Sequence, residues 1–260
     1  MQATEDRHIR RPLRLRPTKS AIDDLTIDIC AIDVRAEYRS ALCRIASLTA
    51  HLTNPPSGRI AMDAAADKQR LRAAARQSRA EAQASDHAGH ACQQMAENFI
   101  AAFASGSGLA PGTVVAGYWP LGSELDVRPL MNRLAASGAD LVLPVTRTPD
   151  LPLEFRRWRP GDGLHKGAHG VMQPDSAAPV AMPSLLLVPL LAFDGDGWRL
   201  GYGAGYYDRT LAELRGRLPV PPILAVGIAY AAQEVVELPH HGGDQRLDGV
   251  VTERAARRFA

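Results

Sequence analysis

Hydrophobic and polar positions follow two different periods along residues 62–260. Helical spacing covers 64–82 and 86–104, where Met95, Phe99 and Phe103 recur every fourth residue. Short apolar runs predict strands at 113–118, 141–145, 153–158, 185–190 and 222–228, and the remaining helical patterns lie at 128–137 and 208–216. Strands that alternate with helices predict a single α/β domain with a doubly wound, mainly parallel, Rossmann-like sheet flanked by helices.

Residues 1–61 have a different character. They begin with an arginine-rich stretch and end in a Pro-Pro-Ser-Gly turn, and their aspartates argue against a transit peptide, which is poor in acidic residues. Asp63 and Asp67 follow Met62 in a pattern typical of a helix N-terminus. We therefore expect 1–61 to be a poorly ordered N-terminal extension and 62–260 to be the working domain.

Composition limits the classes of partner. The formal net charge is only +2, which gives no argument for nucleic acid, and no apolar run reaches the length of a membrane span. The three cysteines form no CxxC pair, which fits a reducing compartment. We expect a cytoplasmic protein with small-molecule partners that is a monomer or a weak homodimer, without nucleic acid or membrane as partner.

The segment 199–209, Arg-Leu-Gly-Tyr-Gly-Ala-Gly-Tyr-Tyr-Asp-Arg, is the most informative part of the chain. It lies between an apolar strand and a helix, and its three glycines let the backbone approach a ligand and direct free N–H groups at it. That chemistry suits phosphate. The segment matches neither the dinucleotide fingerprint nor a P-loop, and a tight structural turn is the alternative.

A pair of cations comes next. Lys68 and Arg72 are four residues apart on one face of the first helix, so both can converge on one polyphosphate. The alternative is a basic face in water, where an ion pair is worth only about 0–1 kcal/mol. The pair matters only if it faces the glycine loop.

The segment 118–126 follows the first strand, where sites are built in this architecture. Trp119 offers a flat stacking surface, and Glu124 offers an acceptor for an amino-pyrimidine-like group. In the alternative interpretation Trp119 belongs to the core, and Ser123 or Asp126 caps the next helix.

Two aspartates are candidate ligands for Mg²⁺. Asp208 follows the glycine loop directly, and Asp248 lies near the C-terminus. Magnesium in proteins takes one or two carboxylates together with phosphate oxygens and water. An aspartate before a glycine, as at 248, is also a common turn residue.

Taken in this order, these motifs resemble the 5-formyltetrahydrofolate cyclo-ligase (5,10-methenyltetrahydrofolate synthetase) family from about Lys68 to Thr252. The resemblance depends on Lys-x-x-x-Arg at 68–72, the segment with Glu124, the run 188–194, the glycine loop and the tail 244–252. No counterpart exists for residues 1–61.

The resemblance implies an ATP- and Mg²⁺-dependent closure of 5-formyltetrahydrofolate to 5,10-methenyltetrahydrofolate through a phosphorylated formyl group, with release of ADP and phosphate. The catalytic residues it implies are Lys68, Arg72 and Asp208, and the magnesium ligands are Asp208 and Asp248. Residues implied to bind ATP are Lys68, Arg72, Arg199, Leu200, Gly201, Tyr202, Gly203, Ala204, Gly205, Tyr206 and Tyr207. Residues implied to bind the folate are Trp119, Glu124, Tyr202, Gly203, Ala204, Gly205 and Tyr206.

Two positions depart from relatives of this family. Ala204 stands where some carry lysine and Tyr202 where others carry arginine, so positive charge must come from Lys68, Arg72 and Arg199. The rival interpretations are a sugar-phosphate isomerase or acyl-transferase-like α/β enzyme, and a non-enzymatic nucleotide-binding protein that uses its basic N-terminus.

Overall fold

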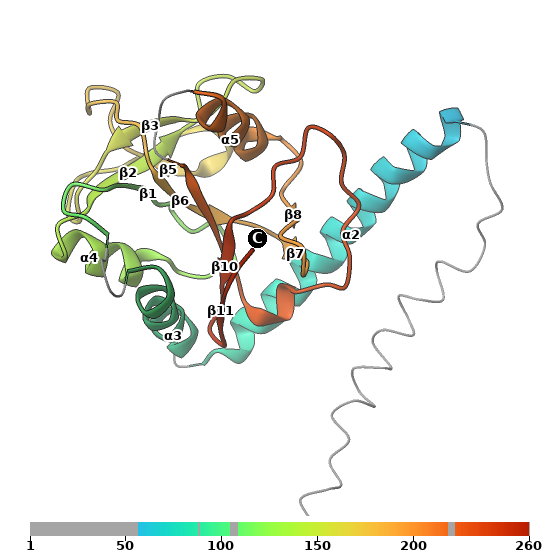
Figure 1. Cartoon of the computed structure of the whole chain (residues 1–260), viewed down its shortest axis with the longest axis horizontal. Coiled ribbons are helices and arrows are strands. Elements are labelled where there is room, and N and C mark those ends of the chain that lie inside the picture. Colours follow the sequence, from blue (N-terminus) through green and yellow to red (C-terminus); the bar gives the residue numbers. More distant parts are fainter. Residues whose placement is uncertain (1–56, 88, 105–108, 218–221, 260) are drawn as a thin grey trace, which may run out of the picture. The chain divides into compact units, whose positions relative to one another are not determined.

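The structure, a computed structural model, describes residues 57–87, 89–104, 109–217 and 222–259. These residues belong to one compact unit, 56–260, which is built around a central sheet (Figure 1).

The central sheet has seven strands in the order β11-β10-β9-β6-β1-β2-β3. The strands are β1 (Val114–Ala116), β2 (Asp140–Val145), β3 (Glu154–Arg157), β6 (Leu185–Pro189), β9 (Leu224–Ile228), β10 (Gly249–Val251) and β11 (Ala256–Arg258). The five inner strands are parallel, and both edge strands, β3 and β11, pair antiparallel with their neighbours. The predicted doubly wound, mainly parallel α/β sheet is therefore confirmed.

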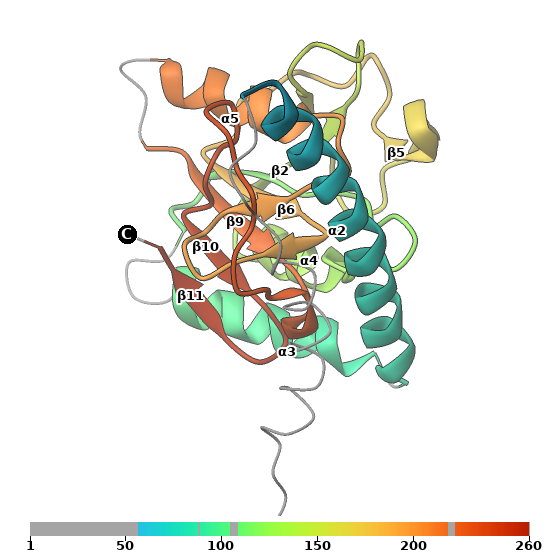
Figure 2. The ribbon, with the colours of Figure 1, turned by 90° about the vertical axis from the view of Figure 1, so that its right-hand side faces the viewer.

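Helices cover both faces of this sheet (Figures 1 and 2). They are α3 (His90–Phe99), which continues as the π-helical turn η1 (Ile100–Ala104), α4 (Arg128–Ala136) and α5 (Tyr206–Gly216). In β6, Leu185 and Leu187 contact the core under α3 and α4, whereas Leu186 and Val188 contact the core under α5. This alternation is why the apolar run 185–190 forms a strand that is buried on both faces.

The long helix α2 (Ser57–Ser85) contacts a different part of the molecule. Its Leu71 and Ala75 pack against Ala192 and Leu200 of the small hairpin β7 (Ala192–Phe193) and β8 (Arg199–Leu200). Figure 2 shows α2 running across the front of the unit, beside the strands rather than on a layer with the other helices. The hairpin leads directly into the glycine loop, so α2 is held next to that loop.

Some boundaries differ from the sequence expectation. Helix α2 begins at Ser57 rather than at Asp63, so Met62 lies inside a helix. Helix α3 begins at His90, because Gly89 takes a left-handed φ of 65° and Asp86 accepts hydrogen bonds from the His90 and Ala91 N–H groups.

Short elements also went unpredicted. The stretch 160–183, expected to be loop, contains the hairpin β4 (His165–Lys166) and β5 (Met172–Gln173) and the 3₁₀ turn η2 (Ala168–Gly170). The hairpin β7–β8, the 3₁₀ turn η3 (Ala231–Gln233) and the terminal strands β10 and β11 were missed as well. Elements of two or three residues are too short to show a period.

The strand order reverses between β1 and β6. From β1 the chain moves outward to β2 and β3, and from β6 it moves in the other direction to β9, β10 and β11. In open α/β sheets ligands bind in the crevice beyond the carboxyl ends of the strands at such a switch point. The segment 117–124 after β1 and the segment 190–205 after β6 border this crevice.

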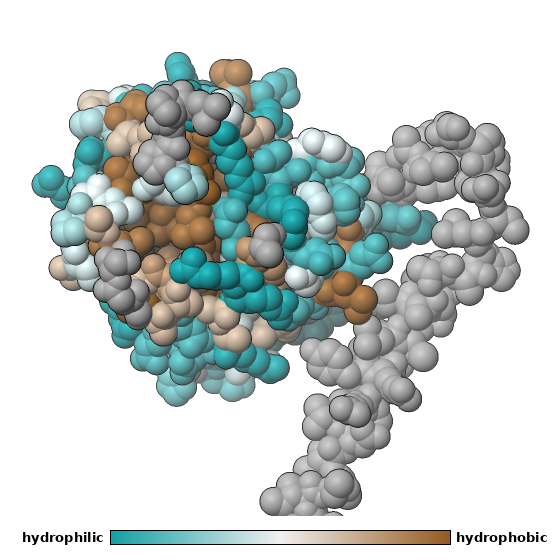
Figure 3. Space-filling view, in the orientation of Figure 1, coloured by the Kyte–Doolittle hydropathy of each residue, from teal (hydrophilic) through white to brown (hydrophobic). Residues whose placement is uncertain are grey.

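The surface in the orientation of Figure 1 is hydrophilic over much of its outline, with hydrophobic residues gathered in a hollow over the central strands (Figure 3). Within the part of the chain that the structure describes, no helix combines the length and the apolar character needed to cross a bilayer.

Candidate active site

The glycine loop, Gly201–Gly205, joins β8 to the N-terminus of α5. Gly203 and Gly205 have φ values of +109° and +70°, a region that side-chain-bearing residues rarely adopt. Gly205 is the N-cap of α5, so the first N–H groups of that helix lie directly after the loop. A helix N-terminus behind a glycine turn is a ready site for an anion such as phosphate.

Of the two predicted cations of α2, Arg72 contacts this loop and Lys68 contacts Asp244. The Arg72 Nε donates a hydrogen bond to the Gly201 carbonyl at 3.1 Å, and a Cβ at Gly203 would lie 3.3 Å from the Arg72 guanidinium. Lys68 Nζ contacts Asp244 Oδ2 at 2.8 Å with its side chain only 15% exposed. The interpretation of Lys68 and Arg72 as a basic face in water is therefore wrong.

Glu124 lies on the other side of the loop and is buried. Its Oε1 accepts a hydrogen bond from the Tyr202 hydroxyl at 2.6 Å, and its Oε2 accepts one from the Leu121 N–H at 2.8 Å. Burial raises the pKa of Glu124, although these hydrogen bonds and the nearby Arg79 charge act against it. Burial, and then the Glu124 carboxylate, raise the pKa of Tyr202 to about 12.

Sequence reasoning missed Arg79, whose side chain completes this group. Its Nε donates to Ser123 Oγ at 3.1 Å and its guanidinium NH1 donates to the Tyr202 hydroxyl at 2.7 Å. Arg76, one turn earlier, lies with its Cζ 5.9 Å from the centre of the Tyr202 ring. The signal was available, because basic residues at 68, 72, 76 and 79 share one helical face.

Trp119 combines both of its alternative interpretations. It is half-buried, packs edge-on against Trp158 with 5.9 Å between ring centres, and carries the Arg128 guanidinium 5.2 Å above its ring. Asp126 accepts a 2.9 Å hydrogen bond from the Arg128 N–H at the start of α4, but the N-cap residue of this helix is Val127, without a side-chain cap.

The Arg199 side chain is buried in contacts within the protein. Its side chain is only 4% exposed, and its guanidinium donates to Asp208 Oδ1 at 2.7 Å and to the Gln245 carbonyl. Its charge thus holds Asp208 and the 245 segment, and its expected contact with ATP stays a prediction. Asp208 Oδ1 also accepts the Gln245 N–H at 3.0 Å.

Asp248 lies apart from Asp208. Its Oδ2 accepts from Arg215 in the last turn of α5 at 2.8 Å and from the Ala225 N–H at 2.7 Å. Ala225 is near the start of β9, and Asp248 itself precedes β10, so this carboxylate lies at the amino ends of the parallel strands. The expected pairing of Asp208 and Asp248 around one magnesium ion is therefore corrected: Asp248 joins α5 to the sheet.

Asp208 is a candidate ligand for a magnesium ion that binds together with phosphate. No cluster of three or more His, Cys, Asp or Glu side chains in the described residues could hold a metal alone. Both contacts of Asp208 go to Oδ1, which leaves Oδ2 as the oxygen that can face a cation beside the glycine loop. One carboxylate with phosphate oxygens and water is a common environment for Mg²⁺.

The remaining predicted loop residues differ in how far their side chains are exposed. Leu200 and Tyr207 pack into the cores, so they can offer a ligand only their backbone. Tyr206 lies under the Arg209 guanidinium, 5.2 Å from its ring centre, and Ala204 is exposed.

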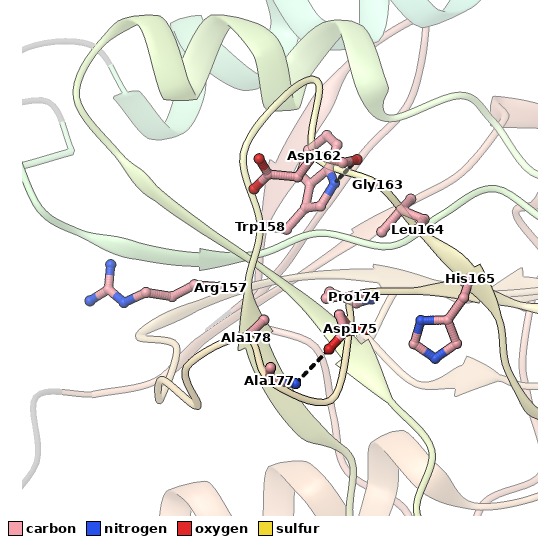
Figure 4. Close-up of a pocket in the computed structure, with 10 residues that line it drawn as sticks. All are labelled: Arg157, Trp158, Asp162, Gly163, Leu164, His165, Pro174, Asp175, Ala177 and Ala178. Carbon is pink, nitrogen blue, oxygen red and sulfur yellow. Dashed lines mark hydrogen bonds between the residues drawn. The ribbon is translucent and has the colours of Figure 1, made fainter.

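A separate cavity of about 600 Å³ lies between the end of β3 and the stretch 162–178 (Figure 4). None of the predicted site residues lines it. Trp158 forms one wall of the cavity and packs edge-on against Trp119. Arg157 and His165 lie at opposite sides of the close-up.

The fold and the site thus define an α/β protein with a ligand site at its switch point, formed by a glycine loop, two cations and a buried carboxylate. The same fold occurs in the NMR structure of a 5,10-methenyltetrahydrofolate synthetase from Aquifex aeolicus, with a TM-score of 0.59 and 28% identity over 74% of this chain and 92% of that one. A 5,10-methenyltetrahydrofolate synthetase from Mycoplasma pneumoniae shares the fold with a TM-score of 0.53 and 23% identity over 72% and 99% of the two chains.

Sequence comparison identifies the family. Residues 64–253 match the 5-formyltetrahydrofolate cyclo-ligase family. The 5-formyltetrahydrofolate cyclo-ligase of Mycolicibacterium smegmatis is 35% identical over 55% of this chain and 75% of its own length, and that of Escherichia coli K12 is 34% identical over 53% and 76%. The chain belongs to the 5-formyltetrahydrofolate cyclo-ligase family and is a ligase of folate metabolism. Membership favours this class over the isomerase and the non-enzymatic alternatives.

Proposed function

We propose that the protein converts 5-formyltetrahydrofolate to 5,10-methenyltetrahydrofolate with ATP and Mg²⁺, releasing ADP and phosphate. The observation that carries the proposal is the position of the glycine loop. On one side the loop contacts Arg72 of α2 through the Gly201 carbonyl, and on the other side Tyr202 contacts the buried Glu124. This five-residue loop therefore lies between a cation that suits phosphate and a carboxylate acceptor that suits a pterin.

The reaction depends more on the alignment of the two substrates than on a nucleophile from the enzyme. The formyl oxygen of the substrate is a poor leaving group, and transfer of the γ-phosphoryl group of ATP onto it makes it a good one. N10 of the same folate then attacks the activated carbon, the ring closes and phosphate leaves. Holding N10 near that carbon makes the second step intramolecular, which is worth a large effective concentration.

Each part of the site has a role in this scheme. Lys68 and Arg72 neutralise the phosphates, and the N–H groups of the glycine loop and of the first turn of α5 orient them. Glu124 accepts hydrogen bonds from the amino-pyrimidine of the pterin, and Trp119 borders that end of the site. Asp244 holds the Lys68 ammonium group in place.

Asp208 is the residue that would hold magnesium. When bound with ATP, Mg²⁺ neutralises charge that develops on the phosphate oxygens. Asp208 is kept in place by Arg199 and the Gln245 N–H, so its position is fixed before any ligand arrives. The protein is expected to act in the cytoplasm, where its small-molecule substrates occur.

One assay tests the proposal. The full chain is mixed with 5-formyltetrahydrofolate, ATP and Mg²⁺, and the absorbance of the methenyl product is followed while ADP is measured in parallel. We expect product formation that needs all three components, with one ADP for each methenyl group formed. Folded protein that gives no product, or product formed equally well without ATP, contradicts the proposal.

A further inference from the structure

We propose that Arg79 is a positioning residue for folate binding, which orients Glu124 and Tyr202 at the pterin end of the site. This inference rests on the proposed function, because it names a residue that prepares the same site for its reduced folate. It concerns how this chain builds that end of the site from three segments far apart in the sequence.

The burial of Arg79 is the first argument. Its side chain is 5% exposed, although α2 is otherwise lined with exposed polar residues. Moving a guanidinium out of water costs free energy unless hydrogen bonds and an opposite charge compensate. A surface helix that buries one arginine at this cost does so around a specific set of partners.

Those partners are the predicted folate-binding residues. The guanidinium donates to Ser123 Oγ and to the Tyr202 hydroxyl, and its NH1 lies 3.7 Å from Glu124 Oε1. The Tyr202 hydroxyl in turn donates to Glu124 Oε1, so Arg79 fixes which way that hydroxyl points. A hydroxyl that accepts from a guanidinium has its own hydrogen free for the carboxylate.

The charge of Arg79 also bears on the ionisation of Glu124. Burial raises the pKa of this carboxyl, whereas the Tyr202 hydroxyl, the Leu121 N–H and the Arg79 charge all lower it. Burial, and then the Glu124 charge, raise the pKa of Tyr118 in its own segment and of Tyr207 in α5. The Arg79 charge therefore acts with these hydrogen bonds in favour of the carboxylate form of Glu124, the form that accepts hydrogen bonds from N–H donors.

The contacts of Arg79 go to the side chains of Ser123, Tyr202 and Glu124, and the Tyr202 hydroxyl is its link to the glycine loop. Lys68 and Arg72 lie two to three turns earlier on α2 and contact Asp244 and Gly201. Loss of the Arg79 charge should thus weaken folate binding and spare ATP binding. A loss of folate binding with unchanged ATP binding distinguishes a positioning role from a general loss of stability.

The primary test replaces Arg79 with methionine in the full chain. We expect the KM for 5-formyltetrahydrofolate to rise about tenfold or more, the effect of about 1.4 kcal/mol, with the KM for ATP changed less than about twofold. Arg79→Lys should restore part of the affinity. The matched control is Arg70→Met, since Arg70 is on the same helix with a side chain 76% exposed.

The pH dependence supplies a readout that a structural role would not move. Without the Arg79 charge the pKa of Glu124 rises further, so more of the carboxyl is protonated at low pH. The folate-binding defect of Arg79→Met should be larger at pH 6 and smaller at pH 8.5, measured by direct titration of 5-formyltetrahydrofolate in the absence of ATP. A defect that is equal at both pH values would overturn the proposal.

Tyr202→Phe covers the case in which Arg79→Met does not fold. It removes only the hydroxyl between Arg79 and Glu124, and the ring is 39% exposed. We expect a smaller increase in folate KM at unchanged melting temperature, and an effect that is not additive with Arg79→Lys. Wild-type turnover with unchanged folate KM in both variants rejects the role of Arg79, whereas absence of wild-type turnover rejects the proposed function instead.

Discussion

Asp208 has two contacts that bear on how its variants should behave. The carboxylate compensates the buried Arg199 guanidinium and accepts the Gln245 N–H, in addition to its proposed contact with magnesium. A variant that removes it therefore acts on stability and on turnover together.

Asp208→Ala should lose most turnover and lower the free energy of unfolding by about 2 kcal/mol, because a buried charged donor loses its partner. Asp208→Asn keeps an acceptor for Arg199 and should lose turnover with a smaller loss of stability. Urea unfolding and the methenyl assay measure the two effects. Glu213→Ala on α5 is the control, since its ion pair with Arg217 is at the surface. Full activity of Asp208→Asn would reject the metal role.

Arg72→Met is expected to raise the KM for ATP about tenfold, which is the loss of about 1.4 kcal/mol, because a charge-assisted contact to phosphate disappears together with the support of the Gly201 carbonyl. The KM for the folate should change less. Steady-state kinetics at varied ATP measures this, with Arg70→Met again as the matched exposed control. Equal KM values for ATP in Arg72→Met and wild type would leave Arg72 without a role in phosphate binding.

At the scale of elements, the loop between β8 and α5 depends on one backbone conformation. Gly203 has a φ of +109°, and a Cβ there would lie 3.3 Å from the Arg72 guanidinium. A side chain at this position is strained and also displaces the cation.

Gly203→Ala should therefore lower kcat/KM about tenfold or more, at a backbone cost of about 1–3 kcal/mol. Gly216→Ala at the end of α5 has no close neighbour and no positive φ, so it should behave as wild type. Kinetics and melting temperature of both variants distinguish strain in the loop from a general effect of replacing glycine. A Gly203→Ala enzyme with wild-type kcat/KM contradicts this account of the loop.

The main elements could be predicted from the sequence because they are long or fully buried. The 185–190 run and the 128–137 helix lie where their apolar patterns placed them, as β6 and α4. Strands β10 and β11 have three residues each, so tertiary pairing rather than a local pattern forms them.

The candidate site was predictable in part for the same kind of reason. Arg72 and Glu124 both contact the glycine loop, because the segments after β1 and β8 meet at the switch point beside α2, whereas Lys68 pairs with Asp244. The partners of Arg199 and Asp248 were not predictable, since Gln245 and Arg215 have no motif that links them to those residues. The magnesium and ATP contacts remain predictions.

At the scale of the whole molecule, the compact unit indicates which residues the catalytic unit contains. The compact unit runs from 56 to 260, and its helix α2 begins at Ser57, a few residues before Met62. We propose that this unit carries the activity alone.

A chain of residues 56–260 should have the turnover and the melting temperature of the full protein, because all contacts of the described site lie within it. Differential scanning calorimetry and the methenyl assay on both chains give the comparison. A loss of turnover in the shorter chain would assign a role to residues 1–55.

The contact between Lys68 and Asp244 joins positions 176 residues apart. A chain still on the ribosome has already made its first helix while the partner of that lysine is not yet synthesised. The proposed ATP-binding site can thus form only after nearly the entire polypeptide has emerged from the ribosome. Only a completely synthesised chain would then bind ATP. Fragments that end early would lack the protection from proteases that a bound ligand gives.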